Sequence, residues 1–326
     1  MSDAIGLSVM IPTWRPDPGF LETAVESVLA QLSPAQASQV ELVDDGSPDF
    51  DVEAFARRFG PNRVAWHRNE RQQGLAGNWN TCIARARYPW VHLLHQDDFL
   101  LDGFYEAILY GIKKAPDAAA VFTASHFVDS MGAGWAPRLV PMSDPGILED
   151  WPQHIFVNLS IQCSAIVVRS DVYKDLGGFE SDLPYTLDWE MWKRIAVRHP
   201  IWFEPRPLAC FRKHPGSETG RQRPSGEHVM EIFRSIDRSR DLLPRDIADR
   251  TVRRARRHYA VFTAEEALAT ARSSGGLRKA FGLLNVARRQ TSSATTVAAL
   301  GKVIARACVR PMLSRRGSVR IAPKDS

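Results

Sequence analysis

The chain has 326 residues, of which 44% are hydrophobic and 24% charged, so it is long and apolar enough to bury a sizeable core. Its four cysteines form no CxxC pair, no apolar run reaches the roughly 18 residues of a membrane span, and the N-terminus lacks the pattern of a signal peptide. These features argue against a disulfide framework, a cysteine zinc site and a membrane-spanning chain. They predict a cytoplasmic globular protein.

Strand patterns alternate with helical patterns from the N-terminus onward. The short apolar runs that we expect to be strands are 7–11, 40–43, 64–67, 88–94, 119–123, 164–169 and 208–211. Apolar side chains recur at helical spacing in 20–32, 77–86, 99–115 and 188–198. The segment 129–151 is rich in Pro, Gly and Met without a clear period, which predicts a loop region. The alternation is typical of crossover connections, so we expect an α/β fold with a mostly parallel sheet.

Two adjacent carboxylates, Asp97 and Asp98, directly follow the expected strand 88–94. Ligands bind at the carboxyl ends of the strands in open α/β sheets, and we expect Asp98 on such an exposed strand end. Carboxylate oxygens are the ligands that Mg²⁺ and Mn²⁺ prefer, and a second acid can accept hydrogen bonds from ribose hydroxyls. The alternative is that one of the two acids caps the helix expected at 99–115.

Six motifs occur in the order seen in family 2 glycosyltransferases with the GT-A fold. They read LSVMIPTWRP, VELVDDGSPD, NERQQGLAGNWN, VHLLHQDDFL, LGGFESDLPYTLDWEMWKRIA and FRKHPGS, and the resemblance spans residues 5 to about 220. It implies a Rossmann-like, mostly parallel sheet flanked by helices. It also implies a metal-dependent, inverting transfer of a sugar from a nucleotide-diphosphate sugar, most often a UDP-sugar, to an acceptor hydroxyl. The acceptor would be a glycan or a lipid-linked molecule of bacterial-type polysaccharide or glycolipid synthesis.

The resemblance also implies a domain division. We expect a GT-A catalytic domain at 1–225, with a nucleotide-sugar half at about 1–125 and an acceptor half at about 126–225. The remaining residues, 226–326, form a helical and basic C-terminal region, of which 251–326 lies outside the resemblance.

The divalent cation, Mn²⁺ or Mg²⁺, is assigned to two residues by the resemblance. Asp98 matches the metal-binding acid of the family, whereas Asp97 matches the acid that contacts the ribose. His214 resembles a histidine that approaches the metal or the diphosphate, and an imidazole ligand suits Mn²⁺ better than Mg²⁺. The alternative is a solvated loop histidine. Arg212 and Lys213 are candidate phosphate contacts.

The nucleotide contacts are also carried over from the family. Pro12, Thr13 and Trp14 resemble the segment that lines the nucleobase, where Trp14 either stacks on the ring or packs on its own domain. Asp45 matches the residue that hydrogen-bonds the pyrimidine. Gly74 matches a glycine at which the chain passes close to the nucleotide.

Asp188 matches the catalytic base, which removes the proton from the acceptor hydroxyl. Glu190 matches the second acid of the motif, but Leu187 stands where the family has a glutamate before the base. The alternative role of Asp188 is an acid in the first turn of a helix, where it interacts with the helix dipole. Two further departures from the family are Arg15, where an asparagine is common, and Trp79, where an arginine is common.

Charge is divided unevenly along the chain, whose formal net charge is +5. Residues 251–326 hold 16 Lys and Arg against 3 Asp and Glu, a net charge of +13, so 1–250, with 26 against 34, carry −8. In the basic region, Val252, Ala255, Tyr259 and Phe262 form an apolar stripe, and similar stripes follow at 277–284 and 300–307.

Basic amphipathic helices of this kind lie on an anionic membrane surface or pack on the catalytic domain or a second subunit. In the first case the protein is peripheral on the inner face of the membrane. Nucleic acid is not expected as a partner, because no aromatic residues interleave with the basic ones.

Two other functions remain open from the sequence. A non-catalytic GT-A-like binding or scaffold module would need no base, and the missing glutamate before Asp188 keeps this alternative open. A sugar nucleotidyltransferase would need a Gly-rich basic loop after the first strand, and IPTWRPDPGF is not such a loop.

Overall fold

A computed structural model describes residues 5–32, 37–135, 141–222, 226–271, 277–290 and 319–320. The chain divides into two units by its internal packing. The first unit comprises Met1–Glu149, Ser160–His214 and Ser318–Ser326, and the second comprises Asp150–Leu159 and Pro215–Gly317. The boundary thus falls at His214, just after the last strand of the main sheet, and the second unit also takes a short segment from the middle of the chain.

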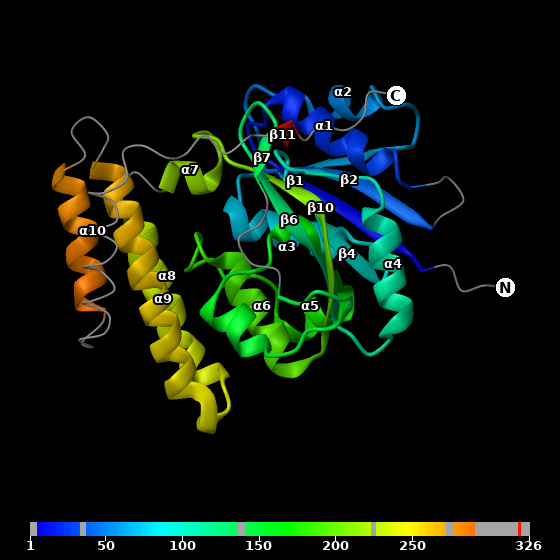
Figure 1. The fold of residues 1–326 in the computed structure, drawn as a ribbon. Coiled ribbons are helices and arrows are strands. Elements are labelled where there is room, and N and C mark those ends of the chain that lie inside the picture. Colours follow the sequence, from blue (N-terminus) through cyan, green and yellow to red (C-terminus); the bar gives the residue numbers. More distant parts are fainter. Residues whose placement is uncertain are drawn as a thin grey trace. The chain divides into compact units, whose positions relative to one another are not determined.

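The first unit is built on one mixed sheet with the strand order β11-β7-β6-β9-β4-β1-β2-β3 (Figure 1). The strands β1 (Leu7–Thr13), β2 (Ser38–Asp44), β3 (Ala65–Arg68) and β4 (Trp90–Leu93) pair in parallel, as the alternating pattern predicts. By contrast, β9 (Ile166–Arg169) is antiparallel to both β4 and β6 (Ala120–Val128). The parallel arrangement is therefore confined to the N-terminal strands and to the pair of β6 with β10 (Ile201–Arg212).

Strand β1 continues through Pro12 to Thr13 instead of ending at the proline. Its pairing with β4 ends at Met10, whereas its pairing with β2 continues to Thr13. Pro12 follows the last residue of β1 that pairs with β4. Its missing N–H therefore costs no hydrogen bond between the two strands. This extension carries the last residues of β1 to the edge at which β2 and β4 also end.

Helices cover the sheet on both faces. The apolar side chains of α1 (Pro18–Leu29), α2 (Val52–Arg57) and α4 (Phe104–Lys114) share one buried core with alternate residues of β1. Helix α3 (Gly74–Arg85) packs against β1, β2 and β4, and its described residues take no part in that core. Because successive side chains of a strand point to opposite faces, α3 covers the other face.

The segment after the two acids is a strand and not the start of a helix. Phe99 and Leu100 form the short strand β5, which pairs antiparallel with β10, and α4 begins only after Gly103. Gly103 has a φ of 88°, a left-handed conformation that favours glycine, and it provides no side-chain cap. Neither Asp97 nor Asp98 caps a helix, so the capping alternative is excluded.

The region expected to be a loop contains two short strands, β7 (Ala133–Trp135) and β8 (Gly146–Ile147). They pair with β6 and β10, and β7 also pairs with β11 (Val319–Arg320). A 3-10 turn at Cys163–Ala165 leads into β9, followed by α5 (Ser170–Leu176) and α6 (Leu187–Arg198). Strands of two or three residues carry too little periodicity to be recognised in the sequence.

The second unit is helical. It contains a short π-helix at Pro152–Val157, α7 (Glu218–Gln222), α8 (Glu227–Leu242), α9 (Arg245–Ala271) and α10 (Leu277–Arg289). Helix α9 packs against α8, α10 and the π-helix, and Ala255 and Tyr259 of its apolar stripe are buried. This stripe is therefore part of the core of the unit. The stripe expected at 300–307 lies outside the described residues. Within the ranges given above, no helix has the length and apolar character needed to cross a bilayer.

Candidate active site

Three parallel strands deliver the candidate residues to one edge of the sheet. Strands β1, β2 and β4 run in the same direction and end at Thr13, Asp44 and Leu93. The segments that follow them carry Trp14, Asp45 and the two acids after β4. The carboxyl edge of a parallel sheet is where ligands bind in open α/β folds, so the candidate residues have the position that the sequence predicts.

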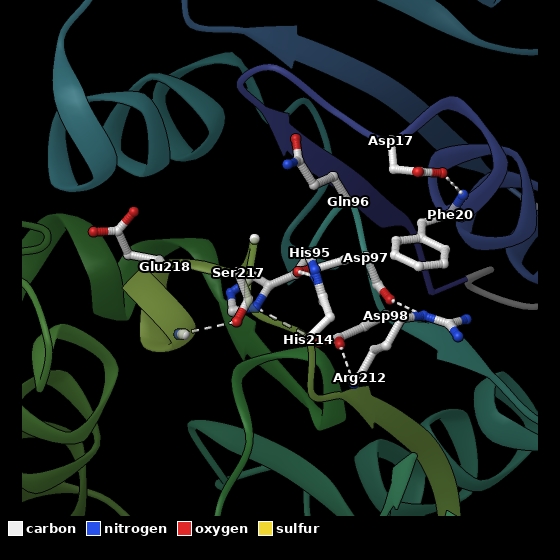
Figure 2. A network of polar contacts seen from close by, with 12 residues as sticks. Asp17, Phe20, His95, Gln96, Asp97, Asp98, Arg212, His214, Ser217 and Glu218 are labelled. Atoms are coloured by element: carbon white, nitrogen blue, oxygen red, sulfur yellow. Dashed lines mark hydrogen bonds and ion pairs between the residues drawn. The ribbon is translucent and has the colours of Figure 1, made fainter. Parts of the chain in front are cut away.

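Asp97 and His214 form a direct pair at this edge. The Oδ2 atom of Asp97 and the Nε2 atom of His214 are 2.8 Å apart, although 117 positions separate the residues in the chain (Figure 2). The side chains are about one-sixth exposed, at 17% and 16%. A carboxylate and an imidazole that meet at the end of the sheet, and that solvent can still reach, are a suitable pair of ligands for a cation.

The sequence predicts Asp98 on an exposed strand end, but in the structure the residue is buried. The residue is 1% exposed. Its Oδ1 accepts a hydrogen bond of 2.8 Å from the backbone N–H of Arg212, and its Oδ2 accepts one from the hydroxyl of Ser164. Burial, and next the charge of Asp97, hold the pKa of Asp98 well above its ordinary value. Asp98 thus joins the turn after β4 to β10 and to the turn before β9.

Arg212 fixes the same turn from β10. Its guanidinium donates to the backbone carbonyl of Asp97 (2.9 Å) and to that of Asp129 (3.3 Å), and the residue is 6% exposed. The guanidinium also lies 4.3 Å from the ring centre of Phe20, and the Phe20 ring meets the His214 ring edge-on at 5.2 Å (Figure 2). A buried arginine with these bonds holds protein carbonyls, so the predicted phosphate contact does not suit Arg212.

His95 lies beside the two acids and packs against an aromatic ring. Its ring lies 5.0 Å from that of Trp79, which is buried and is itself in edge contact with Phe179 at 5.0 Å. One ring nitrogen, Nδ1, is 3.5 Å from Asp98 Oδ2, and the buried Nε2 has no hydrogen-bond partner within the described part of the chain. Ligand atoms of His95, Asp97 and Asp98 all lie within 4.8 Å of one another.

The spacing of the Asp97 and His214 side chains fits two ligands of one divalent cation. Two ligands that are each ~2.1 Å from one ion and at right angles to each other are ~3 Å apart, close to the 2.8 Å between Asp97 and His214. Mixed carboxylate and imidazole donors suit Mn²⁺ better than Mg²⁺. The outer pair, Asp97 and His214, is better placed to hold an ion than Asp98, because the oxygens of Asp98 already accept protein hydrogen bonds.

Asp45 and Gly74 are brought together by the loop before α3. The Asp45 carboxylate is 2% exposed and accepts 2.8 Å hydrogen bonds from the backbone N–H groups of Gln73 and Gly74, and one of 2.9 Å from the amide of Asn69. These bonds give Asp45 an anchoring role at the start of α3. The pyrimidine contact expected of it stays a prediction. Gly74 has a φ of 75°, and a Cβ there would meet no atom within 4 Å, so the space beside it is open.

The segment after β1 is held by side chains from two neighbouring turns. The Gln96 side chain accepts from the N–H of Trp14 (2.8 Å) and donates to its carbonyl (3.2 Å). The backbone N–H of Arg15 donates to the hydroxyl of Ser47 at 2.7 Å. Arg15 has a φ of 45°, which is uncommon for a residue other than glycine. Pro12 and Thr13 are buried at the end of β1, so Trp14 and Arg15 are the first residues of the edge that solvent reaches.

Asp188 lies in the first turn of α6, as the sequence predicts, but it does not cap the helix. The cap position is Thr186, and the Asp188 carboxylate accepts a 2.7 Å hydrogen bond from the N–H of its own neighbour, Trp189. Burial raises the pKa of Asp188 from 3.8 to about 6, although backbone hydrogen bonds oppose the shift. A carboxylate with this pKa is ionised at neutral pH and is a stronger base than an ordinary aspartate.

Cys163 connects Asp188 to the acidic cluster. Burial is the main cause that raises the pKa of its thiol well above the ordinary value, and the charges of Asp188 and Asp98 add to the shift. Both carboxylates therefore lie close enough to one thiol to act on it electrostatically. The turn after β4 and the first turn of α6 therefore both lie near Cys163.

Several residues of the site escape sequence reasoning. Gln96, Ser164 and Phe20 act through hydrogen bonds or ring contacts between segments that are far apart in the chain. Of these, Gln96 lies next to the acids and so carries a signal of position in the sequence. His92, on β4, is buried and hydrogen-bonds Tyr105 and Ser164, so it belongs to the core.

Solved structures share this architecture. Staphylococcus aureus TarS, residues 1–349 in complex with UDP-GlcNAc, matches with a TM-score of 0.67 and 13% identity over 93% of this chain and 88% of that chain. The same fragment in complex with UDP gives a TM-score of 0.64 and 14% identity, with the same shares covered. At such low identity, these matches establish the fold.

Sequence comparison extends the likeness to two curated relatives. An uncharacterized protein of Mycobacterium tuberculosis is 25% identical over 71% of this chain and 74% of its own length. An uncharacterized protein of Sinorhizobium fredii is 25% identical over 67% of this chain but only 23% of its own length. The family profile described as Glycosyl transferase family 2 matches residues 8–172, just over half of the chain, and includes the turn of Asp97 and Asp98. The chain therefore belongs to glycosyltransferase family 2 and has the GT-A fold of these enzymes.

Proposed function

We propose that this glycosyltransferase is a metal-dependent, inverting enzyme that transfers a sugar from a nucleotide-diphosphate sugar to an acceptor hydroxyl. The observation that carries the proposal is the meeting of Asp97 and His214 at 2.8 Å on the carboxyl edge of the sheet. Asp188, with a pKa of about 6, and Asp98, the neighbour of Asp97, both raise the pKa of the buried thiol of Cys163, which supports a position of the base near this pair. A pair of cation ligands and a base at one site are what a displacement at an anomeric carbon needs.

Asp188 would act as the general base. Its carboxylate takes the proton of the acceptor hydroxyl while the acceptor oxygen forms a bond to the anomeric carbon. The bond between that carbon and the phosphate oxygen breaks on the opposite side, and the electron pair leaves with the nucleoside diphosphate. One displacement of this kind inverts the configuration at the anomeric carbon. The position of Asp188 at the start of α6 gives the base a rigid support.

Asp97 and His214 would hold the cation, and Asp98 would fix the turn that carries Asp97. A bound divalent cation neutralises charge on the departing diphosphate. The protein contributes the positions of the ligands: Arg212 binds the carbonyl of Asp97, and Phe20 packs against the ring of His214. We therefore propose Asp97 and His214 as the ligands, in place of the Asp98 and His214 that the family resemblance implies.

A uridine nucleotide is the donor that the comparisons favour. TarS of S. aureus, whose fold this chain shares, is solved with UDP-GlcNAc and with UDP. In this chain, Trp14 stands at the edge next to the cation ligands, where an aromatic ring can stack on a base. We propose a UDP-sugar donor on these grounds, and a glycan or lipid-linked acceptor of polysaccharide or glycolipid synthesis.

A screen of nucleotide sugars tests the proposal. Thermal shifts are measured for the full chain with UDP-, GDP-, dTDP- and ADP-sugars, each with Mn²⁺ and with a chelator, because a ligand that binds the folded state raises its melting temperature. We expect the largest shift for one UDP-sugar with Mn²⁺ and slow release of UDP from that donor. Equal shifts with and without the metal would refute the metal dependence. No shift with any UDP-sugar would refute the choice of donor.

A further inference from the structure

Helix α9 of the second unit carries a row of exposed arginines. Arg250, Arg253, Arg254 and Arg257 follow one another at intervals of three and four residues, so they lie on one face of the helix. All four are exposed. We call them the α9 arginine face.

These arginines have no acidic partner within the described part of the chain. Neighbouring arginines do: Arg240 pairs with Asp249 at 2.7 Å, and Arg256 binds Asp237 and the amide oxygen of Gln290. No Asp or Glu occurs in α9 between Asp249 and Glu265. The face is therefore a concentrated positive charge that the described residues of the second unit do not neutralise, and guanidinium groups are well suited to bind phosphate oxygens.

The opposite side of α9 is occupied by the core of the unit. Ala255, Tyr259, Ala260 and Ala264 are buried, and the hydroxyl of Tyr259 accepts a 3.2 Å hydrogen bond from the N–H of Leu159. Ala255 and Tyr259 of the apolar stripe are thus not available to enter a bilayer. Whatever binds the arginine face does so at the surface of the helix, through charge.

We propose that the α9 arginine face docks the protein on an anionic phospholipid surface by electrostatic adsorption, without insertion of α9. Four arginines in two turns match the closely spaced phosphates of such a surface, and the stretch of α9 from 250 to 257 contains no aromatic side chain to stack on bases. The arrangement would hold the enzyme where lipid-linked acceptors are displayed. The inference does not depend on the metal or on the donor, because it concerns surface charge alone.

Vesicle binding of the full chain tests the proposal. The probes are vesicles of pure phosphatidylcholine and vesicles of an equimolar mixture with phosphatidylglycerol, at low and at high salt. We expect co-sedimentation with the mixed vesicles at low salt and release at high salt. Changing all four arginines to glutamine should weaken binding by up to about 600-fold, since each arginine near an acidic surface contributes about a fivefold gain in affinity.

A charge-matched variant is the control. Arg63, Arg87, Lys113 and Arg198 are exposed residues of the first unit, and changing all four to glutamine removes the same net charge. This variant should bind the mixed vesicles like the wild type, and both variants should keep the wild-type far-UV circular dichroism and the same UDP affinity. The proposal is overturned by equal binding of the wild type and the α9 variant, by an equal loss in the control, or by equal binding to pure phosphatidylcholine. Binding of the α9 face to soluble polyphosphate but not to vesicles would also overturn it.

Discussion

Asp188 is the residue at which stability and the proposed function oppose each other. Its carboxylate is partly buried and its pKa is raised from 3.8 to about 6, so the folded chain holds the proton more tightly than the unfolded chain. The stabilising effect of the protonated form is complete below the unfolded pKa and is lost as the pH rises through about 6. At neutral pH the ionised carboxylate is therefore a cost to stability, which fits a group retained for chemistry.

Replacing Asp188 with asparagine should separate these two effects. Turnover should fall by roughly 10²–10⁴-fold, because an amide cannot take the proton of the acceptor. The melting temperature should rise at about pH 8, where the cost of ionisation is removed, with a gain in stability of ~1–2 kcal/mol, and should change little at about pH 4. If Asp188 served only to interact with the helix dipole, the substitution would instead lower the stability of the protein at neutral pH.

The pH profile of the wild type offers a second check on the same residue. The rate with saturating donor should decrease as the pH falls through about 6, because the base is then protonated. A rate that stays constant down to about pH 4 would mean that an ordinary carboxylate or another group takes the proton.

Asp98 and Asp97 are neighbours with different environments, and alanine substitutions should distinguish them. Asp98→Ala leaves the N–H of Arg212 and the hydroxyl of Ser164 without their acceptor, so we expect a loss of ~1–3 kcal/mol in the free energy of unfolding. Asp97→Ala removes a partly exposed side chain and should cost less than ~1 kcal/mol. Urea denaturation of both variants measures the difference. Equal losses would show that Asp98 does not hold the turn.

At the scale of the elements, the sequence predicts the parallel strands and the major helices of the first unit. Apolar runs locate β1, β2 and β4, and helical spacing locates α1 and α6, with ends that differ by a few residues. Local patterns do not predict β5. Its two residues look like the first turn of α4, and only the pairing with β10, more than 100 residues later, makes them a strand.

The sequence predicts which residue types the candidate site contains. It does not predict the contacts that these residues make with distant segments of the chain. The acids and His214 are identified by motif, but the sequence does not show that His214 meets Asp97 while Asp98 is buried.

The backbone conformation of Arg15 bears on its departure from the family. Its φ of 45° lies in the left-handed region, which asparagine adopts more readily than arginine, so the asparagine common in the family suits the turn better.

The two hydrogen bonds between Gln96 and Trp14 join the segment after β1 to the turn after β4. Gln96→Ala should free Trp14 and weaken UDP binding by roughly tenfold, because two hydrogen bonds of ~0.5–1 kcal/mol each are lost. The affinity for Mn²⁺ alone should not change, since Asp97 and His214 keep their positions. Calorimetry with UDP and with Mn²⁺ measures the two separately, and a parallel loss of both would show that Gln96 supports the whole edge.

At the scale of the whole molecule, the sheet-based first unit and the helical second unit each have a core of their own. The helices of the second unit bury apolar side chains of their own, among them Ile232 and Phe233 of α8 and Ala260 and Ala264 of α9. The unit also takes in the π-helix at Pro152–Val157, whose Ile155 and Phe156 are buried. The described part of the basic region, in α9 and α10, therefore contributes to a helical core and displays charge on its outside.

Truncation after residue 250 should therefore damage the protein. It removes most of α9 and all of α10, so side chains such as Ile232 and Phe156 lose part of the core around them, and the hydrogen bond from Leu159 to Tyr259 is lost. We expect a truncated chain that aggregates or melts at least ~5 °C lower than the full chain. A truncated protein that is monomeric and equally stable in light scattering and thermal melts would show that the second unit is dispensable for folding.

The measurement that tests the account most directly is calorimetry of UDP binding in the presence of Mn²⁺. It compares the wild type with Asp97→Asn, which lowers the charge of the proposed cation site, and with Asp188→Asn, which leaves that site intact. We predict that Asp97→Asn loses at least ~10-fold in UDP affinity with Mn²⁺ and becomes insensitive to the metal, while Asp188→Asn binds like the wild type. Metal-dependent UDP binding that is unchanged in Asp97→Asn would contradict the assignment of the site.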